Sequence, residues 1–176
     1  MPDVRHTDTR LDADTGLDAD TDADTDADAD AWLDADARLA QAVVREAPEA
    51  IVVAGPDGVI RLWNHGAERI FGFAAAEAVG ASLDLIIPEK LRGRHWSGYR
   101  TTMATGATKY GDALLSVPAV HKDGRRVSIE FSVALLRDDA GAVTAISAVM
   151  RDVTERWNAE KALRARLAGL ERERDR

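Results

Sequence analysis

The sequence predicts an α+β fold, a five-stranded antiparallel sheet with helices packed on one face. Three observations lead to this prediction. Five segments have strand character, and turns that contain Gly or Asp join the first to the second, the third to the fourth and the fourth to the fifth. Helical segments stand between the second and the third of these strands. The fourth strand alternates apolar and polar side chains over much of its length, so one face of the sheet is buried.

The first two strands are expected to form a hairpin. Ala50–Ala54 is an apolar run, and Val59–Trp63 is a second one. Between them stands Gly-Pro-Asp-Gly at residues 55–58, a combination that favours a tight turn.

Three helices are expected next. The first covers Asn64–Phe71, with Asn64 as its N-cap, because asparagine side chains accept hydrogen bonds from the first turn of a helix. A short helix covers Ala74–Val79. A longer one follows Pro88 and covers Glu89–Thr105.

Three strands complete the predicted sheet. They cover Asp112–His121, Arg125–Arg137 after a Lys-Asp-Gly turn, and Val143–Arg151 after Asp-Asp-Ala-Gly.

The acidity of the chain belongs to its N-terminal segment. The formal net charge is −8, but residues 1–36 hold thirteen of the 31 acidic side chains and only two basic ones, so the remainder carries +3. With Asp on every second position, the segment has few apolar side chains to bury, and its carboxylates repel one another. Residues 1–30 are therefore expected to be a disordered tail. An EF-hand starting at Asp12 is excluded, because its sixth position is Leu17 and its twelfth is Ala23. Weak, non-specific binding of divalent cations stays open.

A helix is expected on each side of the central domain. Residues 31–47 place apolar side chains at helical spacing, which predicts an amphipathic helix that ends before Pro48. Residues 153–176 are expected to form a C-terminal helix, with Asp152 as its cap. Leu163, Leu167 and Leu170 follow the spacing of a coiled-coil seam, although the charged helix could also simply end the fold.

Composition excludes several classes of function. The chain has no Cys, which excludes disulfides, thiolate metal sites and photochemistry through a cysteinyl adduct. No apolar stretch approaches the roughly 20 residues that span a membrane, and we expect a cytoplasmic protein without membrane contact. The small charge of the central domain argues against nucleic-acid binding. No motif places a nucleophile or a base, so we expect no enzyme.

The central segment resembles a PAS sensor domain. The resemblance rests on residues 64–73 (Asn-His-Gly-Ala-Glu-Arg-Ile-Phe-Gly-Phe), the hairpin before them, the turn at 122–124 and the ending Arg-Asp-Val-Thr-Glu-Arg at 151–156. It covers residues 48 to about 156, with the domain proper at 48–152. It implies a pocket for a small molecule between the sheet and the helices, and a signalling role for the helix after Asp152 and Thr154. It implies no catalytic activity.

The helix at 89–105 carries the candidate ligand. Leu91, His95 and Tyr99 fall on one face of it. The stretch around His95 is similar to that around the proximal histidine of haem-binding PAS oxygen sensors, which implies haem b with His95 as an axial iron ligand. The pocket residues so implied are His95, Tyr99, Leu91, Leu115, Ala113, Phe131 and Val133. From the residues alone, an ordinary surface or hydrogen-bonded core histidine stays open.

One departure from those sensors bears on the ligand. They place an Arg where this chain has Leu115, and Ala113 and Val117 make the same wall apolar. Dioxygen gains from a hydrogen-bond donor, so such a pocket suits CO, NO or a redox change better. A non-covalent flavin against Trp63 or Trp96 is a less favoured ligand.

We therefore expect a sensory module that signals through its C-terminal helix. A homodimer is expected, with a separate signalling partner such as a kinase or regulator as a further possibility. The alternative is a cofactor-free PAS module that dimerises or docks a partner.

Overall fold

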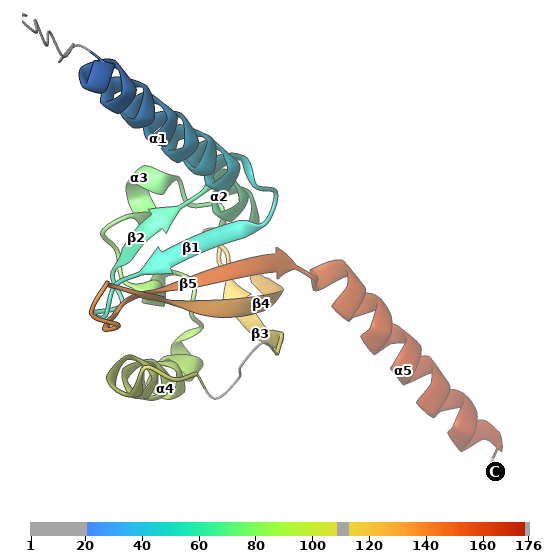
Figure 1. Cartoon of the computed structure of the whole chain (residues 1–176). Coiled ribbons are helices and arrows are strands. Elements are labelled where there is room, and N and C mark those ends of the chain that lie inside the picture. Colours follow the sequence, from blue (N-terminus) through green and yellow to red (C-terminus); the bar gives the residue numbers. More distant parts are fainter. Residues whose placement is uncertain (1–20, 109–112, 175–176) are drawn as a thin grey trace, which may run out of the picture. The chain divides into compact units, whose positions relative to one another are not determined.

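The chain builds one five-stranded antiparallel sheet, as predicted. The computed structural model describes residues 21–108 and 113–174, with side chains from residue 34 onward. The strand order is β2-β1-β5-β4-β3, so β1 and β5 lie next to each other near the centre (Figure 1). The strands are β1 (Ala50–Ala54), β2 (Ile60–Trp63), β3 (Leu115–Val120), β4 (Arg126–Arg137) and β5 (Val143–Asp152).

The helices also follow the predicted order. They are α1 (Thr21–Glu46), α2 (His65–Phe71), α3 (Ala75–Ala78), α4 (Glu89–Thr105) and α5 (Thr154–Arg174), with a short 3₁₀ turn at Leu83–Leu85. The predicted bounds of β1 and α4 are confirmed, and Asn64 caps α2 by accepting a hydrogen bond from the Ala67 N–H. The predicted start of β3 at Asp112 lies outside the described residues.

The N-terminal helix begins earlier than predicted. We expected disorder to residue 30 and a helix over 31–47, but α1 already starts at Thr21. Several positions between the Asp residues are Ala, the strongest helix former, and this preference outweighs the repulsion on which the prediction rested. Residues 1–20 of the predicted tail lie outside the described part of the chain. The described residues divide into two units, one ending at Ala40 and one beginning at Gln41. In the first unit Arg38 and Asp34 pair at 3.7 Å.

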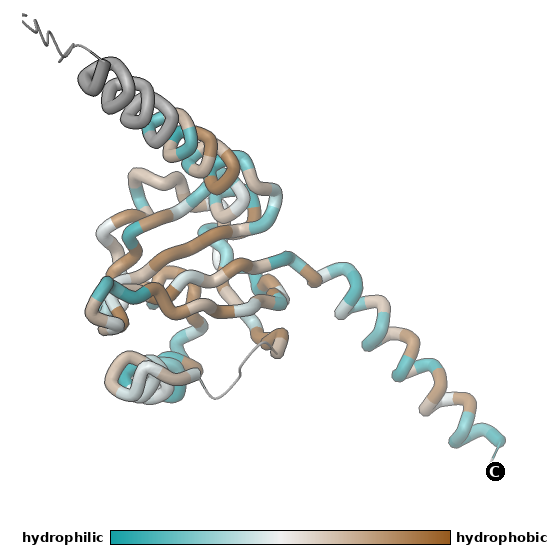
Figure 2. Tube along the Cα trace, in the orientation of Figure 1, coloured by the Kyte–Doolittle hydropathy of each residue, from teal (hydrophilic) through white to brown (hydrophobic). Residues whose placement is uncertain are grey.

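The core lies on the inner face of the sheet. Hydrophobic residues concentrate in the strands (Figure 2). The largest fully buried side chains are Phe71, Ile60, Val52 and Val127. Alternate residues of β4 take part: Val127 and Ile129 are buried, while Phe131 and Val133 are half-buried and pack against the core. The inner face is therefore tightly closed at one end and looser toward Phe131 and Val133.

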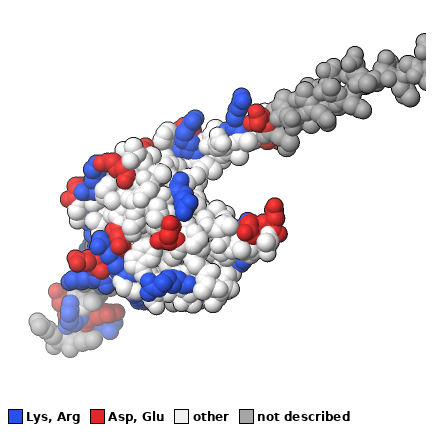
Figure 3. Space-filling view, turned by 90° about the vertical axis from the view of Figure 1, so that its left-hand side faces the viewer, with Lys and Arg blue, Asp and Glu red and all other residues white. Residues whose placement is uncertain are grey.

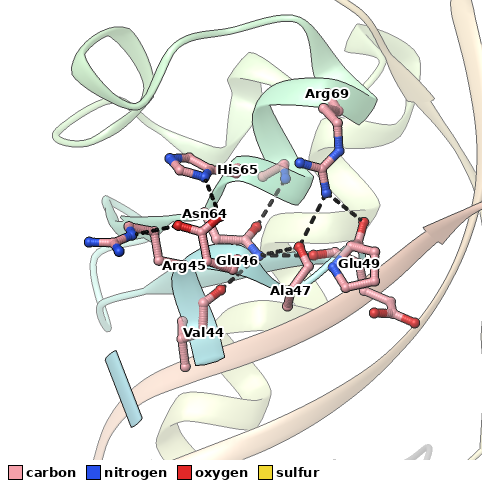
Figure 4. Close-up of polar contacts among 10 residues, drawn as sticks. Val44, Arg45, Glu46, Ala47, Glu49, Asn64, His65 and Arg69 are labelled. Atoms are coloured by element: carbon pink, nitrogen blue, oxygen red, sulfur yellow. Dashed lines mark hydrogen bonds and ion pairs between the residues drawn. The ribbon is translucent and has the colours of Figure 1, made fainter. Parts of the chain in front are cut away.

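Asn64 fastens the end of α1 to this core. Its side-chain oxygen accepts hydrogen bonds from the N–H groups of Ile51 (2.8 Å) and Ala67 (2.9 Å). Its amide nitrogen donates to the carbonyls of Val44 (3.0 Å) and Glu49 (2.9 Å), as Figure 4 shows. One buried side chain thus joins α1, β1 and α2.

Many charged side chains on the described surface form ion pairs, some of them between residues far apart in the sequence. Basic and acidic groups are intermingled over the described part of the face in Figure 3. Lys122, for example, binds Glu77 through both carboxylate oxygens, at 2.6 and 2.7 Å. No helix in the described part of the chain is long and apolar enough to cross a membrane.

Candidate functional site

His95 lies on the inward side of α4 with one ring nitrogen buried. Its Nδ1 atom has no hydrogen-bond partner among the described residues. The ring contacts Trp96, edge-on at 4.9 Å between centroids, and Tyr99 at 5.7 Å, and these two rings contact each other at 5.4 Å. Burial lowers the pKa of His95, and the nearby Asp84 only partly opposes this. At neutral pH the imidazole is therefore uncharged, and its buried Nδ1 is unpaired within the described part of the chain.

Side chains on both sides of His95 fix the position of α4. The Trp96 indole N–H donates to Asp84 Oδ1 at 2.8 Å. Arg92 donates to the backbone carbonyls of Asp84 (3.0 Å) and Ile87 (3.2 Å). The buried Tyr99 hydroxyl donates to the Gly55 carbonyl at 2.6 Å, in the turn between β1 and β2. These contacts hold the helix in place without engaging His95 Nδ1.

Tyr99→Phe is expected to lower the free energy of unfolding by about 1–2 kcal/mol at pH 7, because the buried Gly55 carbonyl loses its donor. Burial raises the pKa of Tyr99 to about 12, above the value of about 10 in an unfolded chain. The neutral phenol thus stabilises the wild type fully below pH 10, and this contribution is lost as the pH rises toward 12.

Urea denaturation between pH 7 and 11.5 measures both effects. Tyr99→Phe should not show the decrease in unfolding free energy that ionisation of Tyr99 causes at alkaline pH. Equal stability at pH 7 together with an equal alkaline slope would contradict the role given to the Tyr99 hydroxyl.

The predicted pocket residues divide into those on the helix and those on the sheet. On α4, Leu91 is half-buried and Tyr99 buried. On the sheet, Leu115 and Phe131 are opposite partners on β3 and β4, and Val133 follows on the same face; all three are half-buried. Half-buried apolar side chains on an inner face are typical of a wall that a ligand can cover.

Ala113 does not belong to this wall. It lies ahead of β3 and is exposed, although the sequence predicted it inside the strand. The prediction extended the apolar alternation of the strand upstream, whereas the ladder with β4 starts only at Leu115. The wall formed by β3 is therefore shorter than expected.

The two aromatic residues considered as flavin platforms already have structural roles. Trp63 is buried in the core, and its indole N–H donates to the Phe73 carbonyl at 3.0 Å. Trp96 packs on Gly58, where an added Cβ would lie 2.2 Å from the ring. Neither indole face is presented as a free platform.

The two residues predicted to transmit a signal lie at the joint between β5 and α5. Asp152 Oδ1 accepts a hydrogen bond from the Thr154 N–H at 2.8 Å. Thr154 Oγ1 accepts one from the Ser128 N–H at 2.9 Å. The joint is therefore tied to β4 as well as to β5.

Sequence analysis missed two groups of residues around these sites. Asp84 holds both Trp96 and Arg92, and it lies on a short turn that carries no motif. Glu130 contacts Arg156 of α5, although the two lie far apart in the sequence. Glu130 stood out only as a polar position in an alternating strand, so no sequence signal marked the contact.

Comparisons with known proteins agree with this architecture. A protein of Azorhizobium caulinodans without an assigned function is 33% identical over 124 residues, 70% of this chain and 17% of that protein. Sensor protein FixL of Bradyrhizobium diazoefficiens is 28% identical over 126 residues, 70% of this chain and 24% of that protein. The chain thus spans about a fifth of the length of these curated relatives.

Solved structures share the fold. The PAS domain of a protein from Colwellia psychrerythraea superposes with a TM-score of 0.59 at 20% identity, covering 67% of this chain and 97% of that one. An RNA-binding light-oxygen-voltage receptor superposes with a TM-score of 0.60 at 26% identity, covering 74% and 36%.

A family model settles the classification. The model described as PAS fold matches residues 44–158, from the last turn of α1 through the joint to the first turn of α5. The matched stretch includes the whole sheet, α4 with His95, and the Asp152–Thr154 joint. By fold and by sequence, this chain belongs to the PAS fold family.

Proposed function

We propose that this chain is a sensory module that holds haem b through His95 and signals through α5. The observation that carries the proposal is the buried Nδ1 atom of His95, which has no partner in residues 21–108 and 113–174. A buried polar atom without a partner destabilises a fold by about 1–3 kcal/mol, and a ligand bound to it would remove this cost.

The chemistry of His95 and of the half-buried apolar residues is compatible with this group. A neutral imidazole is a good axial ligand for iron, and burial keeps His95 neutral. Leu91 on α4 and Leu115, Phe131 and Val133 on the sheet would supply the apolar walls that a flat macrocycle requires. Bound haem would supply an iron centre that takes up a diatomic gas or changes its redox state.

Leu115 bears on which gas is sensed. An aliphatic side chain cannot donate a hydrogen bond, so this wall offers bound dioxygen no stabilisation. CO, NO or a change of redox state therefore suits the proposed site better than dioxygen. A flavin stays the less favoured ligand, because Trp63 and Trp96 are engaged in packing and hydrogen bonds.

His95→Ala is expected to abolish haem binding, because the variant lacks the axial ligand. The measurement is the Soret absorption of protein purified after expression with a haem precursor. His65→Ala is the matched control: His65 lies exposed at the start of α2, bound to Glu46, and its loss should leave the Soret band unchanged. A wild type without a Soret band, or an undiminished band in His95→Ala, would rule out the iron-ligand role.

A cofactor-free interaction module is the second candidate. The observation behind it is a set of exposed apolar side chains on the two flanking helices: Leu39 and Val43 on α1, and Leu163, Leu167 and Leu170 on α5. These side chains would pack in a homodimer or against a separate signalling partner such as a kinase. A chain that is dimeric by light scattering but shows no Soret band would favour this candidate. Neither candidate assigns a catalytic activity to the chain.

A further inference from the structure

The first turns of α5 rest on the outer face of β4. Three residues of β4 that alternate along the strand contact α5. Arg126 lies over the Trp157 ring at 5.6 Å. Ser128 accepts from the Val153 N–H at 2.8 Å and donates its own N–H to Thr154 Oγ1. Glu130 pairs with Arg156.

Glu130 also binds the neighbouring strand. The Ser116 hydroxyl of β3 donates to Glu130 Oε1 at 3.0 Å, on the same carboxylate oxygen that meets Arg156. The Glu130 side chain is 23% exposed and that of Arg156 56%, so solvent partly screens this contact. Arg156, and after it Ser116, holds the pKa of Glu130 below its usual range, so the carboxylate is charged at neutral pH.

The next residue pair on these strands faces the proposed ligand. Ser116 pairs with Glu130 across the ladder, and the adjacent pair is Leu115 with Phe131. Successive residues of a strand point to opposite faces, so Leu115 and Phe131 lie on the inner wall while Ser116 and Glu130 face α5. A displacement of β3 at Leu115 thus also moves Ser116. Ser116 and Arg156 of α5 bind the same carboxylate, that of Glu130.

A groove beside α5 leaves room for movement. It has a volume of ≈ 290 Å³ and lies between β3 and β4 on one side and α5 on the other. Its walls include Ser116 and Pro118 from β3, and Trp157 and Glu160 from α5. A liquid water molecule occupies about 30 Å³, so α5 is not packed flush against the sheet here.

We infer that Glu130 is a positioning residue that couples the inner wall of β3 to α5, through Ser116 on one side and Arg156 on the other. The inference rests on the proposed function only for the source of the displacement, a ligand on the Leu115 wall. The coupling itself is a property of the protein without ligand, and it is tested in that state.

Glu130→Gln is expected to speed backbone hydrogen exchange in residues 153–162 by about two- to five-fold, because the neutral amide holds Arg156 less firmly. Glu171→Gln is the control: it removes an exposed acid from a later turn of the same helix, away from Arg156 and from the N-terminal turn. It should change exchange less than about 1.5-fold. The double variant Glu130→Arg with Arg156→Glu restores opposite charges and should bring exchange back toward the wild type.

A double-mutant cycle tests the coupling. Leu115→Ala, which loosens the inner wall, should speed exchange in residues 153–162 in the wild type and have no further effect in the Glu130→Gln background. Exchange in β1 serves as the measure of global stability. The inference would be overturned if the two substitutions multiplied each other's effect on the exchange rate of residues 153–162. It would also be overturned if Glu130→Gln left that rate unchanged. Because no haem is present in these measurements, a missing Soret band refutes the ligand proposal and leaves this result standing.

Discussion

Asn64→Ala is expected to lower the free energy of unfolding by about 3–5 kcal/mol. Asn64 is only 3% exposed, and alanine would leave the Ile51 N–H and the Val44 and Glu49 carbonyls without their partner. Each unsatisfied buried group costs about 1–3 kcal/mol, and water can reach some of these groups after the junction opens. Urea denaturation measures the loss.

Asn64→Asp separates the two halves of this role. The carboxylate keeps the acceptors for Ile51 and Ala67 but turns an oxygen toward the Val44 and Glu49 carbonyls in place of a donor. At neutral pH a loss at least as large as that of Asn64→Ala is expected, because a buried charge then faces two acceptors. Hydrogen exchange in the last turn of α1 should rise more than exchange in β5. A loss below about 1 kcal/mol for Asn64→Ala would show that water replaces the side chain, and that Asn64 does not fasten α1 to the core.

Gly58→Ala is expected to destabilise the fold by about 3 kcal/mol and to displace Trp96. Gly58 has φ +76°, which costs an L-residue about 1–2 kcal/mol. The new Cβ would lie 2.2 Å from Trp96 Cη2, and the indole cannot move away without stretching its hydrogen bond to Asp84. The variant should therefore also shift the tryptophan emission spectrum, and it should weaken any ligand binding at the neighbouring His95.

Gly124→Ala is the matched control for this substitution. Gly124 has φ +85°, a similar backbone conformation, but an added Cβ meets nothing within 4 Å. It therefore reports the backbone strain alone, and the difference between the two variants measures the clash with Trp96. Equal losses of stability would show that the ring yields freely and that Gly58 does not fix α4.

Local patterns predicted the elements well. The apolar run at Ala50–Ala54 and the helix signals that follow Pro88 depend on neighbours in the sequence, and both elements have the predicted bounds. The N-cap role of Asn64 is equally local, since its partner Ala67 lies three residues away. Its hydrogen bonds to Val44 and Glu49 depend on the tertiary fold, and no spacing of residues in the sequence predicts them.

The candidate site was predictable only in part. Helical spacing placed His95 and Tyr99 on one inward face of α4, and the structure has them in contact. The contact between Glu130 and Arg156 depends on how α5 leaves the sheet, which the sequence of either element does not specify. The residues that could bind a ligand were therefore easier to find than those that could pass on its effect.

The adjacency of β1 and β5 makes this domain easy to insert into other proteins. The first residue of β1 is paired with Met150 near the end of β5, so the chain enters and leaves the sheet at hydrogen-bonded neighbours. A domain with such closely spaced ends can be spliced into a loop or between two helices of another protein without forcing the host segments apart. Duplication and recombination could therefore have moved this unit between proteins with its internal contacts intact.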